Sequence, residues 1–172
     1  MQTIEPTIAH CMTAYMAWAD DITLRNAEQL PEAELMAPRQ TLFETTSGTF
    51  DHILVVAEIF QAHLEGRNHP HCARHRDRVL PFTEIAQRLR AIDAYYVNLA
   101  SSWSNADLAK KVHFEFVGGG EGTMSRQAIL LHLTNHSTYH RGFVSTLIYP
   151  LVSRSQPSNL TVFLREAWLH NN

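Results

Sequence analysis

Residues 132–142 read His132-Leu133-Thr134-Asn135-His136-Ser137-Thr138-Tyr139-His140-Arg141-Gly142, and three histidines recur there at every fourth position. If the segment is helical, this spacing places the imidazoles along one face, with neighbouring Cβ atoms about 5–6 Å apart. Two neutral imidazoles placed in this way can chelate one divalent ion, and imidazole suits Zn, Ni, Cu and Fe. We therefore take His136 and His140 as predicted metal ligands.

The surrounding sequence predicts that this segment is a bundle helix. Apolar residues and two of the histidines follow at steps of three and four, in the order Ile129, Leu133, His136, His140, Phe143, Leu147. A bundle helix faces its neighbours with such a stripe, so His136 and His140 are expected at core positions. A buried imidazole is costly unless its ring nitrogens have partners, and a shared ion is the simplest partner. The alternative is a pair of core histidines that are only hydrogen-bonded.

The composition indicates one globular domain, residues 1–172. Hydrophobic residues make up 45% of the chain, enough for a substantial core, and the formal net charge is −3. This charge gives no reason to expect nucleic acid or an anionic membrane as a partner. No apolar run approaches the roughly 20 residues of a membrane span, and the N-terminus lacks the features of a signal peptide. The two cysteines lie far apart, which fits a reduced, cytoplasmic protein.

Helical periodicity over most of the chain predicts an all-α fold, an up-down four-helix bundle with a short fifth helix at its C-terminal end. Caps and prolines set the expected limits. The helices are expected from Pro6 or Thr7 to Gln29, from Phe50 to Leu64 after an N-cap at Ser47 or Thr49 and before Gly66, from Pro81 or Thr83 onward, from Ser125 to Tyr149, and from Asn159 to Leu169.

Two other segments interrupt the helical pattern. Residues 67–80 are polar and rich in His and Arg, which favours a surface loop. In residues 111–123, alternating apolar positions precede Gly118-Gly119-Gly120, which predicts a small β-hairpin or flap before the fourth long helix. These glycines do not indicate a phosphate-binding loop, because no Gly-Lys-Ser/Thr follows them.

A third metal ligand is expected from a facing helix, since two histidines on one helix hold an ion weakly. In the second expected helix, one stripe at steps of three and four contains Thr49, His52, Val56, Ile59 and His63. His52 borders the apolar side near the start of this helix, whereas His63 lies about three turns farther on. His52 is therefore the predicted third ligand.

Several segments in this order resemble the DinB-like family. They are Tyr15–Ala19, Phe50–Leu54 and Leu131–Gly142, with a weaker match at Asn159–Glu166. The resemblance implies a four-helix bundle, usually a homodimer, that binds one divalent ion, such as Ni or Zn. The histidine triad of the family maps onto His52, His136 and His140. Some relatives are S-transferases or isomerases, which implies a small-molecule thiol and an electrophile as substrates.

The sequence departs from the family pattern at two positions beside the predicted ligands. Many relatives have a second histidine where this chain has Tyr139, and the familiar Gly-Gln after His-Arg is here Gly142-Phe143. Neither change removes a predicted ligand, so we expect an altered pocket wall instead.

Three neutral imidazoles would leave a divalent ion with an open coordination position, as in catalytic sites. Such an ion can lower the pKa of water or bind a thiol as thiolate. The sequence does not fit a zincin, because Ser137 stands where the glutamate would follow the first histidine. It also lacks the Glu-x-x-His pairs of di-iron bundles and the Gly-x-Ser-x-Gly elbow of hydrolases. The expected function is a metal-dependent enzyme; the alternative is a non-catalytic metal-binding or stress-associated module in which the ion stabilises the bundle.

The roles of several other polar residues stay open at this point. His132 is either a fourth ligand, an outer partner of the site or a packing residue at its rim. Asn135 and Glu58 are candidates for accepting a hydrogen bond from a metal-bound histidine. Arg141 is either a surface charge, a buried ion-pair partner or an anion contact. A second histidine-rich set lies in or next to the loop, where adventitious binding is the alternative to a plain surface loop: His63, His69, His71, Cys72, His75.

Overall fold

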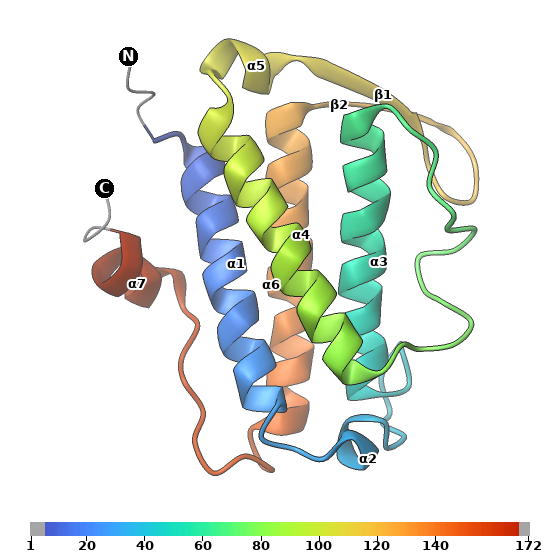
Figure 1. Cartoon of the computed structure of the whole chain (residues 1–172), viewed down its shortest axis with the longest axis vertical. Helices are drawn as coiled ribbons and strands as arrows, with labels where there is room; N and C mark the ends of the chain where they lie inside the picture. Colours follow the sequence, from blue (N-terminus) through green and yellow to red (C-terminus); the bar gives the residue numbers. More distant parts are fainter. Residues whose placement is uncertain (1–5, 169–172) are drawn as a thin grey trace.

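The computed structural model describes residues 6–168, which form a bundle of four long helices (Figure 1). The elements are α1 (Ile8–Ala27), α2 (Glu32–Leu35), α3 (Thr46–Glu65), α4 (Phe82–Ser102), α5 (Asn105–Ala109), β1 (Lys111–Glu115), β2 (Glu121–Ser125), α6 (Arg126–Ile148), α7 (Leu160–Phe163) and a π-helical turn, η1 (Leu164–Trp168). The all-α fold, the hairpin and the short C-terminal helix are thus confirmed. The sequence did not predict α2 and α5, because they are too short to show a helical period. Within these residues no helix is long and apolar enough to cross a membrane.

The directions of the long helices do not simply alternate as in an up-down bundle. Phe82 at the start of α4 packs against Phe50 near the start of α3, and farther along Tyr96 donates a hydrogen bond to the Ala57 carbonyl at 2.6 Å. α3 and α4 are therefore parallel. Residues 66–81, here called the connection, join the end of α3 to the start of α4 and run back along the length of the bundle (Figure 1). Sequence alone did not indicate this path, since a loop signal does not say where the loop ends. The result is that α3 lies antiparallel to α6.

The start of α3 differs from the prediction. Thr45, not Ser47 or Thr49, is the N-cap, and its Oγ1 accepts a hydrogen bond from the Gly48 N–H at 2.8 Å. A Cβ at Gly48 would lie 2.3 Å from the Phe43 carbonyl oxygen, so a glycine is needed inside this first turn. The glycine lets the segment before α3 pack closely over this first turn. The predicted stop at Gly66 is confirmed, with a left-handed φ of 66°.

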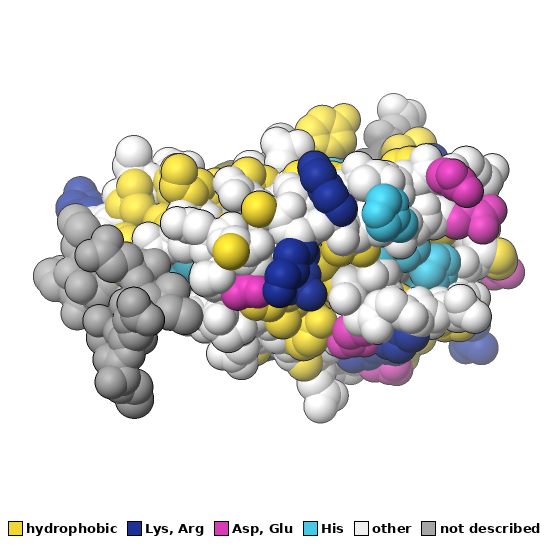
Figure 2. Space-filling view, turned by 90° about the horizontal axis from the view of Figure 1, so that it is seen from above, with side chains coloured by type: hydrophobic (Ala, Val, Ile, Leu, Met, Phe, Trp, Pro, Cys, Tyr) yellow, Lys and Arg dark blue, Asp and Glu magenta, His cyan; other side chains and the backbone are white. Residues whose placement is uncertain are grey.

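The hairpin covers the end of the bundle at which α3 finishes and α6 begins. β1 and β2 pair antiparallel, and the turn between them uses positive φ angles at all three glycines of 118–120. Phe114 of β1 packs on Phe60 and His63 of α3, with ring centroids 5.7 and 4.6 Å apart. Figure 2 looks onto this end of the molecule and shows histidine side chains gathered on one side. The sequence-predicted hairpin therefore forms a wall beside α3.

The inner side of α6 only partly follows the predicted stripe. Ile129, Leu133 and His140 are buried as expected, but Phe143 is 46% exposed. Val144 takes its place, because the centre of the buried side runs through Ser137 and Arg141. The histidines lie to the side of this line and border a pocket instead of filling the core.

The C-terminal segment packs on α1. The Phe163 ring contacts those of Tyr15 and Trp18, with centroids 5.8 and 5.6 Å apart, and Tyr15 donates a hydrogen bond to the Ser158 carbonyl at 3.0 Å. Asn159 stands at the N-cap position as predicted, although its side chain makes no capping bond. The predicted end of this helix at Leu169 lies outside the described residues.

Candidate metal centre

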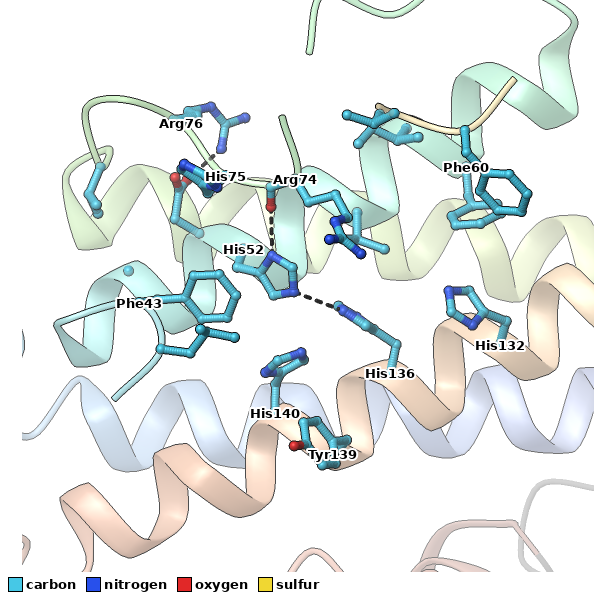
Figure 3. A pocket seen from close by; sticks show the side chains of 18 of the residues that line it. Phe43, His52, Phe60, Arg74, His75, Arg76, His132, His136, Tyr139 and His140 are labelled. Atoms are coloured by element: carbon cyan, nitrogen blue, oxygen red, sulfur yellow. Dashed lines mark hydrogen bonds and ion pairs between the residues drawn. The ribbon is translucent and has the colours of Figure 1, made fainter. Parts of the chain in front are cut away.

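α3 and α6 bring His52, His136 and His140 into one cluster. The nitrogens that they offer all lie within 4.8 Å of one another, and Nε2 of His52 is 3.0 Å from Nε2 of His136. His52 and His140 are buried and His136 is half-buried. Figure 3 shows the His52 ring reaching from α3 toward the two rings on α6. The three residues predicted as ligands are therefore close enough to hold one ion.

The cluster follows from the antiparallel packing of two helices. His136 and His140 stand one turn apart on α6, with ring centroids 4.5 Å apart. His52 comes from the first half of α3 and meets the middle of α6, with its centroid 4.9 and 4.6 Å from the other two rings. All three donors therefore come from two packed helices.

A backbone carbonyl of the connection orients His52. Nδ1 of His52 lies 2.6 Å from the carbonyl oxygen of Arg74. A carbonyl only accepts, so Nδ1 carries the proton of the neutral ring, and the lone pair on Nε2 faces His136. Metal-bound histidines use their second nitrogen in this way. The sequence left Asn135 and Glu58 as candidates for accepting this hydrogen bond. In the structure, the acceptor is the Arg74 carbonyl.

The connection is held on α3 and is not a solvated loop over its whole length. The Arg76 guanidinium binds both Asp51 and Glu58 of α3, and His71 contacts Glu58 at 2.8 Å. The Arg76 and Asp51 side chains are only 16% and 2% exposed. The expectation of a surface loop is thus wrong at Arg76, because two carboxylates of α3 face it. These contacts fix the Arg74 carbonyl above His52.

The other histidines of this region do not form a comparable group. His63, His69, His71 and Cys72 line a second cavity of about 480 Å³ beside the hairpin. Within residues 6–168, only the cluster on α3 and α6 brings three metal-ligating atoms together. The hypothesis that the loop histidines are not a built site agrees with this result.

Burial keeps the clustered histidines neutral. Burial is the main cause that lowers the pKa of His136 to about 3, and the adjacent His140, His52 and His132 and the Arg74 charge add to it. Burial and His52 lower the pKa of His140 to about 4. Burial also lowers the pKa of His52, although the Arg74 carbonyl opposes the shift. All three rings are therefore in the metal-binding form at neutral pH.

Aromatic neighbours hold the rings and close one side of the site. The Phe43 ring stacks on His52 with centroids 4.0 Å apart. His132 packs on Phe60 at 5.0 Å and its ring is 5.9 Å from that of His136. Of the three roles left open for His132, packing at the rim fits this position.

The cluster borders a pocket of about 1220 Å³. α3, α6, the segment before α3, the connection and the hairpin all contribute to its wall, which has an apolar part formed by Val56, Ile59, Phe60, Phe116 and Met124. Pockets for drug-sized ligands usually measure about 300–1,000 Å³. The pocket thus has room for a ligand well beyond a single ion.

A buried ion pair lies on the other side of α6. The Arg141 guanidinium is 2.5 Å from Asp20 of α1 and 2.9 Å from Ser137 Oγ, which itself donates to Asp20 at 2.6 Å. Asp93 of α4 is also buried, and burial together with the Asp20 charge raises its pKa well above the usual value. Arg141 is therefore a buried ion-pair partner. Sequence reasoning missed Asp20 and Asp93, for which the only signal was an acid within a largely apolar helix face.

The nitrogens of His52 and His136 have the spacing expected of two ligands of one divalent ion. Two nitrogens about 2.0–2.1 Å from one ion, at angles of about 90–110°, lie about 2.9–3.4 Å apart, and the two Nε2 atoms are 3.0 Å apart. Within residues 6–168, His136 is the only protein group that contacts the Nε2 lone pair of His52. Neutral imidazoles of this kind suit Zn or Ni.

The comparisons with known proteins agree with this fold. The model of the DinB family matches residues 3–166. The crystal structure of a DinB-like protein from Bacillus cereus ATCC 10987 is similar, with a TM-score of 0.57 and 20% sequence identity over 80% of this chain and 86% of that chain. No curated protein gives a match. Since the family model extends over nearly all of the sequence, including the three clustered histidines, the chain belongs to the DinB family.

Proposed function

We propose that the chain is a metal-dependent enzyme in which His52, His136 and His140 bind one divalent ion, Zn or Ni, beside the pocket. The observation that carries the proposal is the position of three neutral imidazoles at the wall of a cavity of about 1220 Å³. A structural ion would be enclosed by four protein ligands, whereas here His132 stays outside the cluster.

The chemistry that we propose is the activation of a thiol, with water as the alternative nucleophile. A divalent ion on three neutral ligands keeps its full charge and would lower the pKa of a thiol or water bound to it. In S-transfer, the thiol releases its proton to solvent and its sulfur forms a bond to an electrophilic carbon. The bond from that carbon to the leaving group breaks, and the leaving group departs with the electron pair. Some DinB-like relatives catalyse such transfers, which favours the thiol.

The residues of the chain would divide the remaining tasks. The Arg74 carbonyl keeps the Nδ1 proton of His52 in place, so that Nε2 stays available. Phe43 covers one face of His52 and limits the access of water from that side. The apolar wall formed by Val56, Ile59 and Phe60 would hold the body of the substrate.

The first test is the metal content of protein purified without an affinity tag or chelator, with His136→Ala beside the wild type. We expect about one equivalent per chain in the wild type and almost none in the variant. The loaded protein is then incubated with a thiol and an aryl halide, and thioether formation is followed. Wild type that takes up neither Zn nor Ni would refute the metal centre.

The same samples separate the enzyme from the non-catalytic alternative. If the ion only stabilises the bundle, metal should raise the melting temperature while thioether forms no faster than without protein. If the chain is an enzyme, product should form in proportion to bound metal. Metal-dependent stabilisation without any turnover over a panel of thiols and electrophiles would favour the alternative.

A further inference from the structure

Arg74 differs from the other arginines near the pocket. Within residues 6–168 its side chain makes no ion pair, whereas Arg76 and Arg88 bind carboxylates of α3 and α4. Arg74 lines the pocket, and Figure 3 shows its guanidinium extending from the connection toward the side where His136 lies. An unpaired guanidinium that points into a cavity is available to a ligand.

Arg74 and Arg76 are the two arginines of the pocket wall, and of the two only Arg74 has no carboxylate partner within residues 6–168. Three carboxylates line the cavity: Asp51 is neutralised by Arg76, and Glu44 and Asp77 are exposed. A divalent ion on neutral imidazoles would add two more positive charges. The ion and the unpaired guanidinium beside it would therefore favour an anionic ligand at this end of the pocket.

An apolar surface lies in the same cavity. Val56, Ile59 and Phe60 of α3 and Met124 of β2 line it together with Arg74. A ligand that fills this space would place an apolar body against α3 and the hairpin while its charged group meets the guanidinium. Carboxylates suit this contact, because a guanidinium can donate two parallel hydrogen bonds to them.

We propose that Arg74 forms an anion subsite of the pocket, and that the thiol used there carries a carboxylate beside an apolar portion. This inference rests on the proposed function for the thiol, since it names a further group of that substrate. The two parts of Arg74 act separately: its carbonyl orients His52, and its side chain selects the ligand. Substitution of the side chain leaves the carbonyl in place, so specificity can change while metal binding does not.

The first experiment uses the metal-free protein and 3-phenylpropionate, which has a carboxylate and an apolar ring but no thiol. Its dissociation constant is measured by calorimetry for wild type, Arg74→Ala and Arg78→Ala. Arg78 is the matched control, an exposed arginine of the same connection that does not line the pocket. We expect Arg74→Ala to weaken binding about tenfold and Arg78→Ala to leave it unchanged. Absent binding in the wild type, or an equal loss in both variants, would overturn the subsite.

The second experiment uses the cobalt-loaded protein and compares 3-mercaptopropionate with 2-mercaptoethanol, through the sulfur-to-cobalt absorption band. Wild type should prefer the carboxylated thiol by about tenfold, and Arg74→Ala should lose this preference while it keeps its affinity for the neutral thiol. Equal preference in wild type and Arg74→Ala would also overturn the proposal. If cobalt does not bind at all, the proposed function fails, and the calorimetric result still decides the anion subsite.

Discussion

The two sides of α6 carry polar residues within the same two turns and use them in opposite ways. On one side, His136 and His140 face a pocket together with His52, and their lone pairs have few protein partners. On the other side, Ser137 and Arg141 form a closed network with Asp20 of α1, in which each charged group is paired. Polar residues at helical spacing thus mark a binding site only where their donors and acceptors remain available. Where partners satisfy them, the same pattern fixes the helix in the bundle.

The largest expected effect is on the pocket side. His140→Ala should reduce bound metal from about one equivalent per chain to almost none, because two imidazoles from different helices hold an ion weakly. His132→Ala is the matched control, since it removes a histidine from the same helix that packs outside the cluster. Metal analysis with circular dichroism would test this. A His140→Ala protein that keeps its metal, with its helices intact, would show that the cluster is not the site.

The next effect is on the closed side. Asp20→Ala leaves the Arg141 guanidinium buried without its carboxylate, and the loss of one partner of a buried ion pair costs about 3–5 kcal/mol in the free energy of unfolding. Asp21→Ala is the control on the next residue, because its ion pairs with Arg25 and Arg90 are partly exposed and should contribute less than about 1 kcal/mol. Urea denaturation of the metal-free proteins measures both changes. Equal losses in the two variants would mean that the closed network does not hold α1 against α6.

A smaller effect concerns pH on the closed side. Burial and the Asp20 charge raise the pKa of Asp93, so the folded protein keeps a proton that the unfolded chain releases near pH 4, about the ordinary pKa of aspartate. This contribution to stability is complete below about pH 4 and is lost as the pH rises toward the raised pKa. Asp93→Asn has no such proton. We expect the free energy of unfolding of wild type to fall relative to Asp93→Asn between pH 4 and pH 7, by at most about 1.4 kcal/mol per pH unit.

The two proteins can be compared by denaturation at a series of pH values without metal. Asp20, Asp21 and Arg141 also face Asp93, but they are the same in both proteins, so the difference isolates the one carboxyl. Profiles that remain parallel over this range would show that Asp93 ionises in the folded state as it does in the unfolded chain.

The two sides of α6 also differ in how much of their structure could be predicted from the sequence. The spacing of His136 and His140 and the position of His52 at the edge of an apolar stripe were sufficient to predict the cluster, because helix periodicity and helix packing fix all three. The hydrogen bond from His52 to Arg74 was not predictable, since any residue offers a backbone carbonyl. The pair of Asp20 and Arg141 joins residues far apart in the chain, so the sequence could not choose between a surface charge, a buried ion-pair partner and an anion contact for Arg141.

The path of the connection was missed for a related reason. A run rich in His and Arg indicates a loop, but it contains no information about the carboxylates that it meets. Asp51 and Glu58 lie two turns apart on α3, and only the packed helix shows that both face Arg76. The site therefore has a part that local periodicity encodes and a part that depends on the chain path.

The smallest expected effect tests whether the connection supplies a metal ligand in addition to those on α3 and α6. His75 lines the pocket and follows Arg74 directly, yet it is not a member of the cluster. His75→Ala should leave metal content unchanged, because the Arg74 carbonyl and the contacts of Arg76 still hold the connection over His52. Metal analysis of this variant beside Arg76→Ala makes the test informative, since Arg76→Ala removes an anchor of the connection and should loosen the metal while His75→Ala does not. A halved metal content in His75→Ala would mean that the connection supplies a ligand of its own, so that the site depends on the chain path and not only on the two helices.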